Sequence, residues 1–469
     1  MKIEHALLDE RMLAGRKCAC GKYVASRRRE KASSHMPMPS RLLILAAVGA
    51  PCALLAQPAA AQVLDQYLPP NIPGYATELG VTVQSRLRPD YEPLGIRAGS
   101  VIIRPNMSES LGYNDNALGT TQSHGSMEAE TQATLAANTD WNRNGLSAYF
   151  NVDDLHYPEQ PSQNQTNWIA GVGGFYEFGR DRLELGYTHF NLNQGPTAID
   201  SFSLQLPVTY RVDDVRASYT TQFGRFSVTP NAEFSYYNFD NTVVGGQPFS
   251  QQFRNRDMIQ GGLTTRYEFS AQRNAVLVVR GYDTRYITPQ IGQPKRDNSG
   301  FAVLGGIEYL WSGALRFRAL VGYEQREYTS SAYKTQTAPV AEASVIWTPT
   351  ELTTVTGTLS RIIEDAADET VTGYTYTTFR GVVDHELLRN VLLQGHAGVQ
   401  AADYQQGGGT QTIYNVGVNA TWLLNRNLQL RASYDYTNSS SSGTTAATNG
   451  PNSGDYNSNI YLLTLGVAL

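Results

Sequence analysis

The chain has 469 residues, a formal net charge of −5, 42 glycines and 28 tyrosines. An acidic balance lacks the basic stripe that nucleic-acid binding requires, so we expect no nucleic-acid partner. No stretch after residue 61 approaches the roughly 18 consecutive apolar residues of a membrane-spanning helix. Membrane-spanning β-strands are still allowed, because each needs only about 9–11 residues and alternates apolar with polar side chains.

The first 61 residues have the order of a secretory signal. The basic cluster Arg27–Arg29 precedes the apolar run Leu42–Ala56, and Ala59–Ala61 supplies small residues for cleavage before Gln62. We therefore expect residues 1–61 to be an N-terminal extension with a signal peptide that is removed on export; a buried helix is the weaker alternative. All three cysteines fall in this leader: Cys18, Cys20 and Cys52. The exported chain then has neither a disulfide nor a thiolate metal site.

Residues 62–97 form a separate, proline-rich segment. Its prolines would interrupt any regular element: Pro69, Pro70, Pro73, Pro89 and Pro93. We expect an extended stretch on the periplasmic side that leads into a domain of residues 98–469.

From Ser100 onward, alternating strands are separated by short turns and longer polar loops in strict succession. The eight short turns are Asn138–Gly145, Gly179–Arg182, Phe223–Phe226, Ala271–Asn274, Ser312–Ala314, Pro349–Glu351, Leu388–Asn390 and Asn425–Asn427. The nine longer loops are Tyr113–Ser126, His156–Asn167, Gln194–Leu206, Asp240–Arg256, Pro289–Gly300, Ser330–Gln336, Glu364–Thr370, Tyr404–Thr410 and Thr437–Tyr456. This order predicts an all-β protein, an up-and-down antiparallel barrel of about 18 strands, or 16 if a weak pair is misread. A soluble sandwich has no reason to keep its long loops at one end, whereas an outer-membrane barrel does.

The strand Trp168–Phe178 has an apolar residue or glycine at every second position, and Phe301–Trp311 repeats the pattern. Ten residues span about 33 Å along a strand. With a tilt of about 40° the rise is about 25 Å, the height of the apolar band of a membrane barrel. Aromatic residues sit at the ends of such rows and predict girdles at two membrane interfaces: Trp168, Tyr176, Phe178, Phe301, Tyr309, Trp311, Tyr323, Tyr414, Trp422, Tyr434 and Tyr436.

The opposite rows are polar and charged. A charge on the lipid face near the midplane would cost about 2–4 kcal/mol, so these side chains should face inward. The candidates for the lumen are Arg216, Glu233, Arg266, Glu268, Arg316, Arg318, Glu324, Arg431 and Asp435. A barrel of about 16–18 strands leaves an aqueous lumen, where opposed charges can select solutes. Ordinary ion pairs that brace the wall are an equal alternative.

Two strands depart from this pattern. Ala275–Ile287 is apolar on both rows through Val279, so its facing is undecided, and Pro230 predicts a bulge.

Catalytic motifs are missing from the sequence. There is no G-x-S-x-G and no H-E-x-x-H, and no helix follows the Gly-rich stretches as a phosphate loop would need. We expect each histidine of the exported chain to be an exposed polar residue. The acidic pairs Asp153-Asp154, Asp213-Asp214 and Glu364-Asp365 are expected to be solvated acids at strand ends. The chain is therefore predicted to be no enzyme, with no cofactor and no metal.

The segment Arg88–Asn116 resembles the opening of the putative β-barrel porin 2 family. The shared features are P-x-Y-x-P-x-G-I-R-x-G-S from Pro89 and a first strand that ends in G-Y-x-D-N at Asn116. The resemblance implies an outer-membrane barrel of Gram-negative bacteria, in some cases encoded near exopolysaccharide genes, with no catalytic residues. The last residue, Leu469, departs from the aromatic residue that usually ends such barrels and that the insertion machinery reads.

We thus predict an exported outer-membrane protein that is a passive channel for small hydrophilic solutes. The alternatives are a conduit or accessory for exopolysaccharide export, or a structural surface protein whose lumen is closed by residues 62–97 or by a folded-in loop. The expected partners are outer-membrane lipid and lipopolysaccharide, the barrel-insertion machinery, and a small solute or polysaccharide.

Overall fold

The computed structural model describes residues 67–75, 81–201, 206–244, 246–290, 292–311, 314–368, 371–405, 408–443 and 455–469. The predicted leader lies outside these ranges, so its cleavage stays a prediction. Among the described residues, eighteen long strands form one antiparallel wall: β2 (Val101–Asn114), β3 (Ser126–Thr139), β4 (Asn144–His156), β5 (Gln165–Phe178), β6 (Asp181–Gln194), β7 (Val208–Phe223), β8 (Phe226–Phe239), β11 (Arg256–Ser270), β12 (Arg273–Tyr286), β13 (Asn298–Trp311), β14 (Leu315–Tyr328), β15 (Gln336–Thr350), β16 (Thr353–Asp365), β17 (Gly373–Leu388), β18 (Val391–Tyr404), β19 (Gly409–Leu423), β20 (Leu428–Gly443) and β21 (Tyr456–Ala468).

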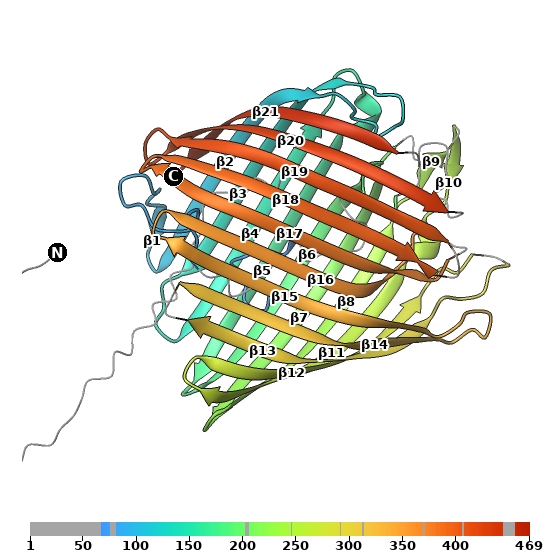
Figure 1. Cartoon of the computed structure of the whole chain (residues 1–469), viewed down its shortest axis with the longest axis horizontal. Helices are drawn as coiled ribbons and strands as arrows, with labels where there is room; N and C mark the ends of the chain where they lie inside the picture. The colour runs from blue at the N-terminus through green and yellow to red at the C-terminus, as the bar shows by residue number, and fades with distance from the viewer. Residues whose placement is uncertain are drawn as a thin grey trace, which may run out of the picture. The chain divides into compact units, whose positions relative to one another are not determined.

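Each long strand pairs with the next one along the chain, and the last strand returns to the first. β21 pairs with β2 from Ile460 opposite Asn114 to Ala468 opposite Asn106, which closes the wall into a barrel. Figure 1 shows the tilted strands that run around this wall. The short hairpin β9 (Thr242–Val244) and β10 (Gln247–Phe249) lies in the loop between β8 and β11. The predicted barrel is confirmed, at the upper of the two strand counts.

The alternation of short turns and long loops is also confirmed. β5 and β6, for example, are joined by Gly179 and Arg180 alone. Gly179 and Gly224, each in a tight turn, have φ angles of 70° and 61°, a conformation in which glycine avoids the strain of a side chain. The strand ends that the longer connections join therefore lie at the opposite end of the barrel, which we call the loop end; the other is the turn end.

The outer face of the wall is apolar. On β5, Val172 and Phe178 expose 55% and 53% of their surface, and the corresponding row of every neighbouring strand is similar. The predicted girdle residues lie on these outward rows. Trp168, Phe301, Tyr323, Tyr414, Tyr434 and Tyr436 are toward the loop end, and Tyr176, Phe178, Tyr309 and Trp422 are toward the turn end. The side chain of Trp311 lies outside the described part. Whether these rings mark membrane interfaces stays a prediction.

The two irregular strands are now explained. On β12, Leu277 and Val279 face outward, while Val276 and Val278 face inward and pack with Leu304 and other inner-wall residues. One apolar row of β12 thus forms part of the outer surface, and the other forms part of an apolar patch on the inner wall. The predicted bulge at Pro230 is wrong, because β8 keeps one register with β7 and with β11 on both sides of it. The ladder with β7 omits this position, since proline has no N–H to donate.

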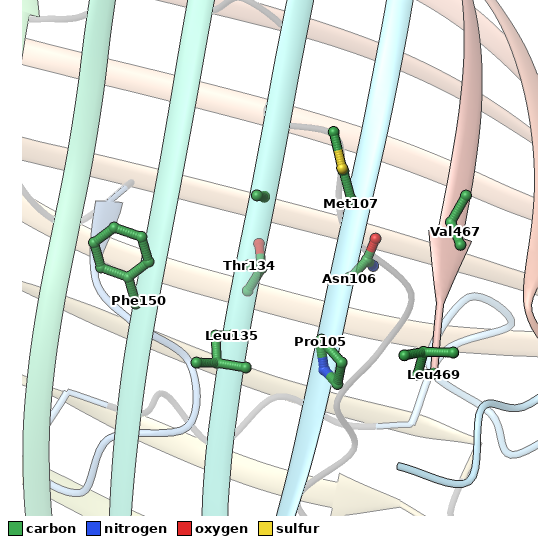
Figure 2. A pocket seen from close by; sticks show the side chains of 9 residues that line it. Pro105, Asn106, Met107, Thr134, Leu135, Phe150, Val467 and Leu469 are labelled. Atoms are coloured by element: carbon green, nitrogen blue, oxygen red, sulfur yellow. The ribbon is translucent and has the colours of Figure 1, made fainter. Parts of the chain in front are cut away.

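The seam of the barrel lies beside the chain terminus. β1 (Ile96–Ala98) pairs with the first residues of β2, which extend past the end of β21. The backbone N–H of Leu469 donates to the carbonyl oxygen of Pro105 at 3.2 Å. An apolar groove of about 320 Å³ adjoins this contact on the outer face. Figure 2 shows Phe150, Leu135 and Leu469 along it. Among the described residues, no helix is long and apolar enough to span a membrane.

Candidate functional site: the lumen

The inner wall carries the charged residues that the sequence singled out, and most of them have close partners. Arg216 on β7 donates from Nε to Asp214 Oδ1 at 3.0 Å and from Nη2 to Glu233 Oε1 at 3.2 Å. Arg266 on β11 donates to Glu308 Oε2 at 3.1 Å. The Arg216–Glu233 pair joins neighbouring strands and the Arg266–Glu308 pair joins next-neighbouring strands, so both also brace the wall, whereas Asp214 lies on the same strand as Arg216.

A second group surrounds Glu342 on β15. Arg280 lies 2.6 Å and Arg318 3.8 Å from its carboxylate oxygens. Arg316 lies two residues before Arg318 on the same inward row of β14. Glu268 is exposed near the turn end of β11, where its carboxylate accepts the backbone N–H of Gln272. Two guanidinium groups thus share one carboxylate across the wall.

The most buried charges lie near the loop end. Arg326 Nη1 donates to Asp365 Oδ1 at 2.6 Å, and Arg256 Nε lies 3.5 Å from Asp365 Oδ2. Glu324, predicted from the sequence, accepts the hydroxyl of Tyr282 at 2.8 Å. Arg326 and Arg256 were not predicted. Arg326 is two residues beyond Glu324 on the same row, so a longer reading of the alternation would have found it.

Arg431 and Asp435 lie four residues apart on the same inward row of β20, but they have different partners. Arg431 donates to Thr421 Oγ1 at 3.2 Å, and Asp435 Oδ1 lies 2.9 Å from His396 Nε2. His396 is buried in the inner wall, so the expectation that every histidine is exposed was wrong for it. The expectation of solvated acids was likewise wrong for Asp214 and Asp365, which are buried because they face a filled part of the lumen.

Part of that filling is the proline-rich N-terminal segment. Residues 67–75, which we call the plug arm, lie against the inward faces of β5, β6 and β7. A Cβ atom added to Gly173 or Gly186, whose neighbours on either side face outward, would point at Ile72 or Tyr75 of this arm. Tyr75 is 3% exposed and its hydroxyl donates to the backbone oxygen of Asp214 at 2.6 Å.

The next part of the segment is fixed on the far side of the lumen. Residues 81–95, the anchor arm, contact β16 to β19. The N–H of Val83 donates to Thr354 Oγ1 at 3.1 Å, and its side chain packs against Leu392. Both Arg86 and Arg88 pair with Glu386, the latter at 2.9 Å.

The loop between β6 and β7 also reaches across the lumen. Its residue Ile199 is buried in a cluster with Tyr374, Tyr404 and Ile413, which face inward on β17, β18 and β19. Seven long strands lie between β7 and β17 on one path around the barrel, and six lie between β19 and β6 on the other, so the contact joins opposite walls.

The next residue, Asp200, holds this loop in place. Its carboxylate accepts the Tyr404 hydroxyl at 2.9 Å and the Ala367 N–H at 2.6 Å. Burial raises the pKa of Asp200 to about 7, although the Ala367 N–H and the charge of Arg254 act in the opposite direction. Arg254 is itself fully buried, and it donates a hydrogen bond from each of its two terminal nitrogens to Gln194 Oε1, both at 3.1 Å. Burial lowers the pKa of Arg254 to about 10.

These features describe a polar, charged lumen that two segments of the chain enter. In the described part of the molecule, no group of three or more His, Cys, Asp or Glu is placed to hold a metal ion. The chemistry that the lumen offers is the electrostatic and hydrogen-bonding recognition of a solute.

A protein-family model described as putative beta-barrel porin 2 matches residues 88–465. The comparison with curated proteins gives no match. Among solved structures, the chain is similar to OccK9 (OpdG) of Pseudomonas aeruginosa, with 12% identity, a TM-score of 0.42, and coverage of 79% of this chain and 98% of that one. It is also similar to a BenF-like porin of Pseudomonas fluorescens Pf-5, with 9% identity, a TM-score of 0.41, and coverage of 78% and 99%.

Proposed function

Because the chain belongs to the putative beta-barrel porin 2 family, and is therefore a porin-like β-barrel of the outer membrane, we propose that it is a channel for small hydrophilic solutes rather than an enzyme. The observation that carries the proposal is the contrast between the two faces of the wall. The outward rows expose apolar side chains, while the inward rows carry ion pairs such as Arg216–Glu233 and Arg280–Glu342. A polar inner wall is suited to contact with water and with solutes that pass through the lumen.

The lumen-facing charges then have two roles. Arg266, Arg280 and Arg318 present guanidinium groups on one side of the lumen, balanced by Glu308 and Glu342. Charged side chains that line the lumen favour polar solutes over apolar ones. They also hold neighbouring strands together, so the two roles coexist.

The same placement defines the proposed partners. The apolar outer rows face membrane lipid, and the aromatic residues at their ends face the interfaces, including lipopolysaccharide at the loop end. The terminal strand β21 is the part that the insertion machinery reads.

The test is conductance. Purified protein in planar lipid bilayers is expected to give discrete current steps, and vesicles that contain it should swell in isotonic solutions of small sugars. A comparison of boiled and unboiled protein on a detergent gel serves as the control for folding, since a closed barrel migrates differently before heating. A folded barrel that gives neither current steps nor swelling, even after removal of the plug arm, contradicts the proposal.

A further inference from the structure

We infer that the plug arm, residues 67–75, is a reversible plug of the lumen that moves on a fixed anchor arm, residues 81–95. This inference rests on the proposed channel function and adds its regulation. The plug arm is a segment of the chain itself that occupies a groove of the inner wall.

The groove is shaped to receive the plug arm. Gly186 on β6 forms its floor: a Cβ there would lie 2.5 Å from the ring of Tyr75 and 2.6 Å from the carbonyl oxygen of Pro73. All three atoms nearest to that Cβ belong to the plug arm. The space left by the missing side chain of Gly186 is therefore filled by the plug arm and not by a neighbouring residue of the wall. Arg216 closes one side, with its guanidinium carbon 4.8 Å from the centre of the Tyr75 ring.

The contacts that hold the plug arm are neutral on the side of the arm. Its sequence, YLPPNIPGY, contains no charged residue. Besides the Tyr75 hydroxyl, the amide of Asn71 donates to Asn138 Oδ1 at 3.2 Å and to the backbone oxygen of Ala148 at 3.3 Å. Tyr67 and Leu68 pack at the margin of an apolar cluster of the inner wall. Neutral hydrogen bonds can be exchanged for water at low net cost. The larger cost of release is the exposure of Ile72 and Tyr75, which are buried in the docked arm.

The anchor arm is held in a different way. Arg86 and Arg88 share the carboxylate of Glu386, and Arg88 also donates to the backbone oxygen of Val83 at 2.7 Å. β1 then joins the arm to the sheet through three residue pairs. Removal of this arm would leave Glu386 without its two cations, so it stays in place when the plug arm leaves.

Release of the plug arm exposes a polar surface. The groove beneath it contains Arg216 and Glu233, Ser235, whose hydroxyl donates to Asp214 at 2.6 Å, and Thr188 on β6. These groups are the hydrated wall that a polar solute would pass. The plug arm therefore occupies the path that the proposed function requires.

A disulfide lock tests this inference. The chain has no cysteine after Cys52, so an introduced pair is unambiguous once the leader is removed. The plug pair is Ile72→Cys with Gly171→Cys, where a Cβ on Gly171 would lie 3.4 Å from Ile72 Cγ1. The control pair is Val83→Cys with Thr354→Cys, which locks the anchor arm to the wall where the backbone N–H of Val83 donates to Thr354 Oγ1 at 3.1 Å. Disulfide formation in each variant is verified by mass spectrometry.

Planar-bilayer recordings should then separate the two arms. The oxidised plug pair is expected to abolish current steps and to recover them on addition of a reductant, while the control pair conducts like the unmodified protein in both states. An oxidised plug pair that conducts like the unmodified protein overturns the inference.

Two variants complete the test. Gly186→Ala should raise the open fraction roughly tenfold, because the added methyl group and the plug arm compete for one space. Gly398→Ala, which adds a methyl group to the inner wall on β18, should leave it unchanged. Deletion of residues 67–75 should give a channel that the plug arm can no longer close. If the deletion variant folds as a barrel but is silent, the channel function itself fails; if it conducts while Gly186→Ala has no effect, only the inference about the plug groove fails.

Discussion

On β5, Val172 and Tyr176 face outward with about half of their surface exposed, whereas Ile169 on the other side of the same strand is buried in the lumen. The two faces are stabilised by different contacts. Outward residues need only be apolar, because lipid adapts to any shape. Inward residues have specific partners, several of which are far away in the chain, so a change there removes a defined interaction.

The largest effect is expected where an inner-face charge is buried. Arg326→Met leaves Asp365 without its closest cation, at 2.6 Å in the native barrel, and should lower the free energy of unfolding by about 3–5 kcal/mol. Urea unfolding in lipid vesicles, followed by tryptophan fluorescence, measures it. Arg266→Met is the matched control: its pair with Glu308 is about one-third exposed, and its loss should cost at most about 1 kcal/mol. Equal losses would contradict the distinction between buried and hydrated pairs.

On the outer face, a charge should be costly wherever it is placed at mid-strand. Val172→Arg is expected to lower stability by about 2–4 kcal/mol, because lipid cannot solvate the guanidinium. Asn231→Arg at a similar depth on the inward row of β8, beside Glu233, should change it much less. The same unfolding assay compares them. If both substitutions were tolerated equally, the assignment of the outward row to lipid would be wrong.

The inner face should also respond to pH through Asp200. Because burial raises the pKa of Asp200 to about 7, the docked loop binds a proton that a released loop, with an ordinary pKa of about 3.9, does not. Docking is therefore strongest at acidic pH, weakens by up to about tenfold per pH unit as the pH rises from about 4 to about 7, and changes little above that. Tyr404, Tyr374, Arg254 and Asp368 are titratable groups that face this carboxylate.

Recordings of the open fraction between pH 5 and pH 9 measure this dependence. The channel should be open more often at the alkaline end. Asp200→Asn should remove the dependence while it keeps the local backbone, because asparagine also tolerates the positive φ of 56° found there. A dependence that persists in Asp200→Asn would assign the titration to another group.

The smallest effect concerns the seam. Leu469→Phe places a ring beside the apolar groove of Figure 2 and should stabilise the barrel by about 0.5–1 kcal/mol. Leu463→Phe, on the same outward row of β21 but outside the groove, is the control. The fraction of heat-modifiable protein after refolding into vesicles measures the gain without any insertion machinery. No difference between the two variants would mean that the groove contributes nothing.

The features that could be predicted are those set by local pattern. A strand places successive side chains on opposite faces, so the row from Trp168 to Phe178 was assigned correctly from the letters alone. Loop lengths determined the topology, because short turns can join only antiparallel neighbours. The inward position of Glu324 followed from the same alternation, and so would that of Arg326.

The content of the lumen could not be predicted in this way. Tyr75 and Asp214 are 139 residues apart in the chain, and Val83 and Thr354 are 271 apart. His396 and Asp365 look like ordinary strand residues until a segment or another side chain covers them. No local pattern in the sequence predicts such contacts, because they form only when the wall has closed.

The sequence by itself therefore determined the barrel, its number of strands to within two, and which face of each strand is apolar, because a period of two and the order of turns are local properties. The tertiary structure decided which charges meet, that the plug arm and the loop of Asp200 enter the lumen, and where they dock. The physical reason is closure: it brings β6 and β7 opposite β17 to β19 and encloses a space that the remaining segments of the chain can fill.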